Sequence, residues 1–379
     1  MANPSSTSSS ERKGVKAWPW ALLIAALTIW IVDGLALGVD GPWPWLMKHS
    51  PPRGGQRGVV MERLSQKEIR DRPAETRGVF VAGSSRALHG FDRNALGLDT
   101  ERGLMVAQVG RPSMGPFEIH SATADLLRMN PDAVVIFASE FDTHRPIQVV
   151  PNRSSGNVTA IVSLMNDIGP GNLWRQRHDI YRLFLVEALH SYRYRDVLGH
   201  TILNRFRRFR VDDERFPKGK KPRAGSLNIG ATTGKDYRAA QNATYRRLLP
   251  QLPEDSVRFR AQVRQIYNIR PGTHVEIQQR QLRRAVEALS RGGVMVLVVE
   301  APLHPLAVEI YDTSLRQEFL DFARALETLP GVTFLPLELH EPFTAEDFMD
   351  LTHLNRDGAA RFTAPILDRL TAPSADASS

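Results

Sequence analysis

The chain has no cysteine among its 379 residues, and this absence excludes several kinds of chemistry. A protein without cysteine forms no disulfide, uses no thiolate nucleophile and binds no metal through sulfur. Its histidine and acidic residues also lack the spacing of a metal site. The sequence therefore predicts no metal and no other cofactor, and any catalysis must come from hydroxyl, imidazole and carboxyl groups.

Lysine is also scarce, so the basic character of the chain comes from arginine. Eight of the 49 basic residues are lysine, which leaves 49 − 8 = 41 arginines, and the formal net charge is +8. A basic chain can bind nucleic acid, an anionic membrane or an acidic polymer, or it can carry a solvated basic surface. No RRM, zinc-finger or clear helix-turn-helix signature is present, so we predict no nucleic-acid partner.

A long apolar run lies near the N-terminus. Residues 17–39 contain Asp33 as their single charge, and this stretch is long enough to cross a hydrocarbon core of ~30 Å. Arg12, Lys13 and Lys16 precede it, which predicts a cytoplasmic N-terminus. We therefore expect a single-pass signal-anchor in the inner (plasma) membrane, with the C-terminal domain extracytoplasmic. A cleaved signal peptide and a buried core helix are the alternatives.

The rest of the chain divides by composition. Residues 1–16 are expected to form a disordered cytoplasmic tail, 40–75 a juxtamembrane linker and 371–379 a second disordered tail. Residues 76–370 are expected to form one domain, interrupted by a basic and aromatic helical insertion at about 145–270.

Short apolar runs bounded by glycine and proline recur through this domain, with helical periodicity between them. Such runs are typical of buried parallel strands. We expect five strands, at 78–82, 104–109, 132–137, 294–299 and 331–336. The alternation predicts an α/β, flavodoxin-like fold with three layers and a five-stranded parallel sheet.

Residues that can carry acyl chemistry follow these strands, where sites of such folds lie. Ser85 follows the first strand, and Asp350 and His353 follow the fifth. A serine hydroxyl needs a base, and an imidazole base needs a group that holds its tautomer, which Asp350 could supply. The backbone N–H groups of Ser85 and Gly110 are the expected oxyanion donors.

Each of these segments has a simpler interpretation. Gly-Ser-Ser after a strand can be a turn with a helix N-cap, and Asp-x-x-His can be a helix start with a surface histidine. The nucleophile-elbow pattern is not met, because Ala87 stands where its second glycine should be. Their joint occurrence at one sheet edge is what favours a Ser–His–Asp site.

Four segments together resemble the SGNH (GDSL-type) hydrolase superfamily, and more narrowly its DltD-like, envelope polysaccharide O-acetylation branch. They are VFVAGSSR at 79–86, QVGRPSMG at 108–115, VVIFASEFD at 134–142 and DLTHLNRDG at 350–358. The resemblance implies Ser85 as nucleophile, Gly110 in the oxyanion hole, Asp350 as orienting acid and His353 as base.

The third family motif departs from its usual form. Where the family has Gly-x-Asn-Asp, this chain has Ala138-Ser139-Glu140-Phe141, so the usual Asn donor is missing. Ser139 or a backbone N–H would take its place as oxyanion donor. Arg86, next to the nucleophile, and His304, between two prolines after the fourth strand, are expected to contact substrate.

The expected function is an acyl (acetyl) transferase or esterase that acts on a cell-envelope glycan, or another hydroxyl acceptor, through an acyl-serine intermediate. The resemblance also suggests a membrane-bound O-acyltransferase as the partner that supplies the acyl group. The alternative is a non-catalytic envelope polysaccharide assembly or binding protein on an SGNH scaffold.

Overall fold

The structure is a computed structural model, and nine segments of the chain are described. They are residues 18–37, 67–110, 114–144, 158–189, 273–305, 308, 313–340, 342–349 and 352–371. The predicted tails, most of the predicted linker and most of the predicted insertion lie outside these residues, apart from Thr371 at the end of the last helix.

The core of the domain is one six-stranded sheet. Its strands are β1 (Arg77–Ala82), β2 (Gly97–Asp99), β3 (Leu104–Gln108), β4 (Ala133–Ala138), β5 (Met295–Glu300) and β6 (Val332–Leu335). Their order is β2-β3-β1-β4-β5-β6, with β2 antiparallel to β3 and every other pair parallel.

The predicted α/β class is confirmed, but the predicted five-stranded parallel sheet was wrong. The sheet is mixed and has β2 as a sixth, antiparallel edge strand. This strand is only three residues long and reads Gly-Leu-Asp. An edge strand with one apolar residue has no run of buried side chains, so the sequence gives no strand signal there.

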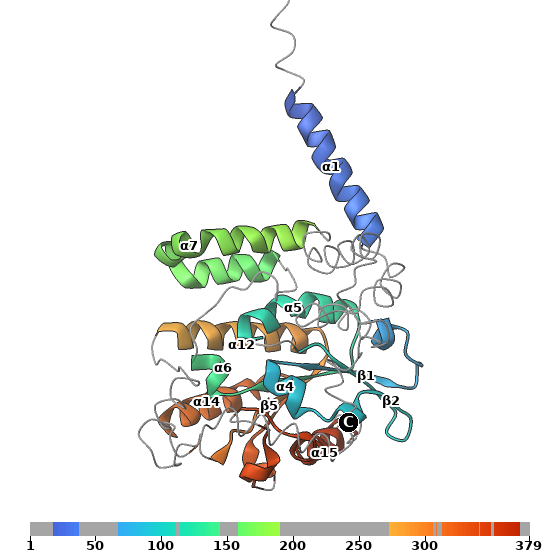
Figure 1. Cartoon of the computed structure of the whole chain (residues 1–379), viewed down its shortest axis with the longest axis vertical. Coiled ribbons are helices and arrows are strands. Elements are labelled where there is room, and N and C mark those ends of the chain that lie inside the picture. Colours follow the sequence, from blue (N-terminus) through green and yellow to red (C-terminus); the bar gives the residue numbers. More distant parts are fainter. Residues whose placement is uncertain are drawn as a thin grey trace, which may run out of the picture.

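Helices cover both faces of the sheet (Figure 1). Apolar residues of α5 (Pro116–Arg128), α12 (Thr273–Arg291) and α14 (Thr313–Leu326) pack on one face. Those of α4 (Ser85–Gly90) and α15 (Arg356–Thr371) pack on the other. Because both faces are covered, the central strands are continuously apolar rather than alternating.

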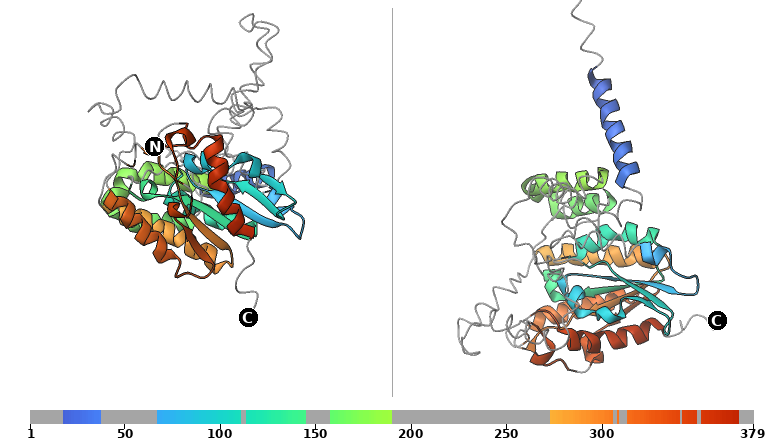
Figure 2. Two further views of the ribbon diagram at one scale, coloured as in Figure 1. Left: turned by 90° about the horizontal axis from the view of Figure 1, so that it is seen from below. Right: turned by 45° about the vertical axis from the view of Figure 1, so that its right-hand side comes forward.

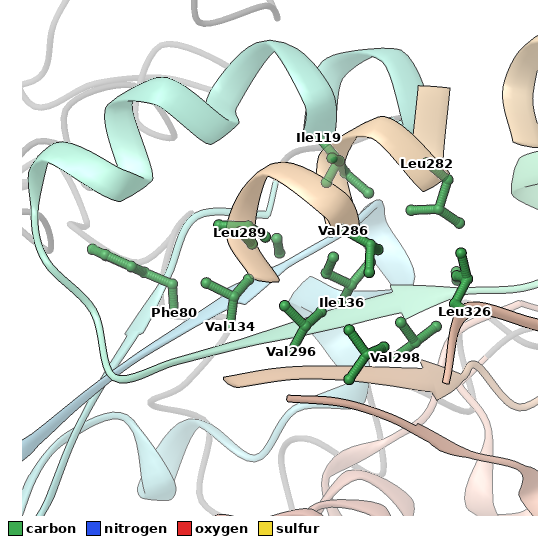
Figure 3. Close-up of a cluster of buried hydrophobic side chains, with 14 of the residues drawn as sticks. Phe80, Ile119, Val134, Ile136, Leu282, Val286, Leu289, Val296, Val298 and Leu326 are labelled. Atoms are coloured by element: carbon green, nitrogen blue, oxygen red, sulfur yellow. The ribbon is translucent and has the colours of Figure 1, made fainter. Parts of the chain in front are cut away.

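Alternate residues of each central strand serve the two faces. Val134 and Ile136 of β4 point toward α12, where Val286 and Leu289 lie (Figure 3). Val135 lies in the cluster on the opposite face. All of these side chains are fully buried, which is the arrangement expected for strands between two helical layers.

The described part of the insertion is α7 (Val158–Ala188), which packs beside α5 (Figures 1 and 2). It contains a kink at Gly169, whose φ of 72° is outside the helical region. Five of its buried apolar residues form a separate small core with Phe117 of α5 and Ile277 of α12. The remaining short elements are α6 (Glu140–His144), η1 (Arg93–Ala95), η3 (Leu337–Leu339) and η4 (Ala345–Asp347).

The predicted membrane anchor is corrected by the structure. The helix in that region is α1 (Trp18–Leu37), and no described helix is both long and apolar enough to be a membrane span. Asp33 and Gly34 lie within this 20-residue helix.

The strand order reverses at β1. β3 lies beside β1 on one side and β4 lies beside it on the other. Ligands of open α/β sheets bind at the carboxyl ends of the strands where the order reverses in this way. The predicted site residues with described positions follow five strands: Ser85 after β1, Gly110 after β3, Ser139 after β4, His304 after β5 and His353 after β6.

Candidate active site

Ser85 and His353 meet at the sheet edge. The hydroxyl oxygen of Ser85 lies 2.8 Å from Nε2 of His353, although 268 positions separate them in sequence. This is a normal hydrogen-bond distance between a hydroxyl and an imidazole. Both side chains are half-buried, so each is reachable from solvent. The pair has the geometry of a nucleophile with its base.

A tight turn after β1 presents Ser85. Gly83 has a φ of +144°, and a side chain there would place its Cβ 2.9 Å from the carbonyl oxygen of Phe137. Ser84 then caps α4 by accepting a hydrogen bond from the backbone N–H of Arg86 at 3.3 Å. Glycine is required for the turn, and the cap starts the helix with Ser85 as its first residue.

Gly110 lies against the same turn. A Cβ at Gly110 would stand 2.9 Å from the carbonyl oxygen of Gly83, so only glycine lets β3 approach this closely. The end of β3 is also tied to α4, because the Gln108 side chain donates to the carbonyl of Ala87 at 2.7 Å. The structure therefore brings Gly110 beside the turn that carries Ser85.

His353 has a neighbour that the sequence interpretation missed. The hydroxyl of Thr352 lies 3.0 Å from Nδ1 of His353. If Nδ1 carries the proton and donates it to Thr352, Nε2 is free to accept the proton of Ser85. Asp350, the predicted orienting acid, lies outside the described residues. Thr352 lies inside the motif DLTHLNRDG at 350–358, directly before His353, and this position was the sequence signal that could have pointed to it.

Replacing Thr352 by valine is expected to lower kcat for an ester substrate about three- to tenfold with little change in KM. The loss corresponds to one hydrogen bond of ~1 kcal/mol that orients the base. A Thr352→Ser variant keeps the hydroxyl and should retain most of the activity. Steady-state kinetics across pH 5 to 9 would measure both, and equal losses in the two variants would contradict the assignment.

Arg86 and Ser139 contact each other rather than an open site. The Arg86 guanidinium donates to the Ser139 hydroxyl and to the Asp142 carboxylate, both at 2.6 Å, and its side chain is only 7% exposed. The Ser139 backbone N–H donates to Asp142 at 3.1 Å. These bonds tie α4 to the start of α6, and the predicted substrate and oxyanion roles of the two residues stay predictions.

Two further histidines lie near the base. The ring of His89, in α4, stands edge-on to His353 with 4.8 Å between ring centroids. His304 is fully buried and packs at 5.2 Å against Phe348, in the segment that leads to His353. Phe348 in turn forms a β-bridge with Leu354. His304 thus supports the loop that carries the base, and its predicted substrate contact stays a prediction.

Glu140 occupies the position of the missing Asn. Its carboxyl is buried, and this burial raises its pKa from the ordinary value to about 7. A carboxyl with this pKa is largely neutral at mildly acidic pH. Among the described residues, no group of three or more His, Cys, Asp or Glu side chains is placed to hold a metal ion.

Comparison with known proteins adds little to this geometry. A family model of unknown function matches residues 246–372, which is 372 − 246 + 1 = 127 of the 379 positions. The match contains His353 but not Ser85, and it covers less than half of the chain. No curated protein matches the sequence.

Proposed function

We propose that this protein is a serine-dependent acyl hydrolase or acyltransferase of the SGNH kind. The observation that carries the proposal is the 2.8 Å contact between the Ser85 hydroxyl and His353 Nε2, at the sheet edge where the strand order reverses. A half-buried serine with an imidazole in hydrogen-bond contact is the minimum apparatus of nucleophilic acyl transfer.

The chemistry has two balanced halves. The Ser85 oxygen attacks the ester carbonyl while His353 Nε2 takes the hydroxyl proton, and the tetrahedral intermediate then collapses. The leaving alkoxide receives that proton from His353, so an alcohol departs and acyl-Ser85 remains. Water or an acceptor hydroxyl then attacks acyl-Ser85, gives its proton to His353, and the proton returns to Ser85 as the product leaves.

Backbone N–H groups are the best candidates to stabilise the negative oxygen of the intermediate. Ser85 begins α4, so its N–H is not used within the helix, and Gly110 lies against the turn before it. Two such donors would be worth several kcal/mol of transition-state stabilisation in a site shielded from water, at roughly 3 kcal/mol each. The proposed contribution of Gly110 is therefore its backbone N–H, which the absence of a side chain allows to lie close to the turn at Gly83.

The acyl group and the acceptor come from the resemblance alone. It suggests an acetyl group, an envelope-glycan hydroxyl as acceptor and a membrane-bound O-acyltransferase as donor. Hydrolysis and transfer use the same Ser85 and His353, so the acceptor decides between them. Product analysis with and without a glycan acceptor distinguishes the two outcomes.

A second candidate function, a non-catalytic glycan-binding or assembly protein, is favoured by one observation. Glu140 replaces the family's Asn donor, and the neighbouring Ser139 backbone N–H already donates to Asp142. The third motif thus has no free backbone N–H at Ser139, and the Ser139 hydroxyl is an acceptor from Arg86. The intact Ser85–His353 contact opposes this candidate.

Labelling by a fluorophosphonate probe tests the proposal directly. The probe reacts covalently with a serine hydroxyl only when a base activates it. We expect the full chain to be labelled, and Ser85→Ala and His353→Ala to lose at least roughly 99% of the label, because each removes one half of the dyad. Labelling that survives in Ser85→Ala, or none in the parent chain, would overturn the proposal.

A further inference from the structure

A pocket separate from the serine lies at the carboxyl ends of β4 and β5. It has about 120 Å³ of internal space. Its lining residues are Glu140, Glu300, Ala301, Leu303, Val308, Arg316 and Leu337. The walls are aliphatic and the charged groups are few, which is the make-up of a small-molecule site. Val308 is 49% exposed, so the pocket has an edge that solvent reaches.

The basic side chains around this pocket already have carboxylate partners. Arg316 donates to both oxygens of Glu300, at 2.7 and 3.1 Å, and to Glu338 at 2.7 Å. Arg86, on the α4 side, bonds Asp142 at 2.6 Å. On the α6 side, His144 Nε2 lies 3.2 Å from Glu318.

Glu140 is therefore the carboxyl of the pocket without a cation of its own. It is 1% exposed, and its Oε1 has no hydrogen-bond partner among the described residues. Burial raises its pKa to about 7, and the nearby Glu300 carboxylate adds to the rise. The residue's own backbone N–H and the charges of Arg86 and Arg316 lower the pKa by less. An ionised Glu140 would gain strongly from a positive ligand.

We propose that this pocket binds a small primary ammonium ion with a short aliphatic chain. The ammonium donates to the unpartnered Oε1 of Glu140, and the chain packs against Leu303, Val308 and Leu337. The ligand supplies a cation for Glu140, while the aliphatic walls remove its methylene groups from water. A neutral alcohol lacks the charge and an aliphatic acid carries the wrong one.

The ammonium site does not depend on the proposed acyl chemistry. Ser85 and His353 are not among the residues that line the pocket. A Ser85→Ala chain should therefore bind the ammonium ion as tightly as the parent chain does. Loss of labelling at Ser85 and loss of ammonium binding are separate results that bear on separate proposals.

Calorimetric titration of the full chain with butylammonium tests the chemical class. At pH 8, where Glu140 is largely ionised, butylammonium should bind at least about tenfold more tightly than 1-butanol or butyrate. Equal affinity for butylammonium and 1-butanol would overturn the proposal, because it would show that only the aliphatic walls contribute. The absence of any butylammonium binding would overturn it as well.

Two variants locate the binding group. Glu140→Gln keeps the shape of the side chain but removes its charge, and should weaken butylammonium at least about tenfold. Glu338→Gln is the matched control: this carboxylate bonds Arg316 from outside the pocket lining and its side chain is 54% exposed. It should leave the affinity within about twofold. Equal effects of the two substitutions would contradict the assignment to Glu140.

Proton release gives a measurement that needs no variant. At pH 6, below the pKa of about 7, Glu140 is mostly protonated, so pairing with ammonium must expel its proton. Titration in two buffers with different ionisation enthalpies should show release of close to one proton at pH 6 and almost none at pH 8.5. The affinity should fall about tenfold per pH unit below the pKa. Binding without proton release at pH 6 would rule out Glu140 as the partner.

Discussion

Ser85→Ala and His353→Ala are each expected to reduce kcat for an aryl acetate at least roughly 10³-fold, and the double variant no further. The two side chains act as one unit: the hydroxyl is a weak nucleophile without the imidazole 2.8 Å away, and the imidazole has no proton to take without the hydroxyl. Steady-state kinetics of the parent chain, the two single variants and the double variant form a double-mutant cycle. This cycle measures the coupling between Ser85 and His353.

Matched surface variants control for nonspecific effects. Ser290 lies at the end of α12 and bonds the carbonyl of Pro330, and His178 of α7 is exposed. Ser290→Ala and His178→Ala should keep full turnover, and all chains should melt within about 3 °C of the parent, as surface substitutions usually do. If the losses from Ser85→Ala and His353→Ala multiplied in the double variant, the two residues would be acting independently and the dyad would be wrong.

Asp142→Ala is expected to destabilise the fold by about 3–5 kcal/mol, the largest stability effect among the charged residues we consider. Its carboxylate is 6% exposed and accepts from Arg86 at 2.6 Å and from the Ser139 backbone N–H at 3.1 Å. Truncation leaves the guanidinium of Arg86 buried without its counter-ion, and desolvation of that charge is costly. Urea unfolding followed by circular dichroism measures the change.

Two further variants test whether the expected loss of stability comes from the burial of the Arg86–Asp142 pair. Asp125 also pairs with an arginine, Arg128 at 2.6 Å, but that arginine is 69% exposed, so Asp125→Ala should cost less than about 1 kcal/mol. Replacing both members of the buried pair, by Arg86→Met with Asp142→Leu, should restore much of the loss because no charge is left unpaired. A double variant less stable than Asp142→Ala would contradict this account.

The strands of the sheet show how much of the fold was predictable. Five of the six were expected within one or two residues of their observed bounds, because a strand buried on both faces must be a continuous apolar run. β2 was missed because an edge strand of three residues carries no such run. The apolar run at 17–39 predicted a membrane span, whereas no described helix is both long and apolar enough to be one.

Some of the site residues could also be predicted from the sequence, and others could not. Ser85, Gly110 and His353 were chosen because they follow strands, and strand ends of one parallel sheet share an edge. The roles expected for Arg86 and Ser139 depended also on which side chains pair, and the sequence does not reveal that. The pairing with Asp142 joins residues 56 positions apart through the fold. The sequence marks Glu140 only as the residue that replaces the family's Asn donor and does not reveal its burial.

The sequence by itself determined the alternation of strands and helices and the set of side chains able to carry acyl chemistry, because both depend on local residue patterns. Tertiary structure alone decided three things: that Ser85 meets His353, that Arg86 turns inward to Asp142, and that Glu140 is buried without a cation. Each is a contact or a loss of water between segments far apart in the chain. Distances, hydrogen bonds and pKa shifts of that kind depend on the packed environment, which no local pattern encodes.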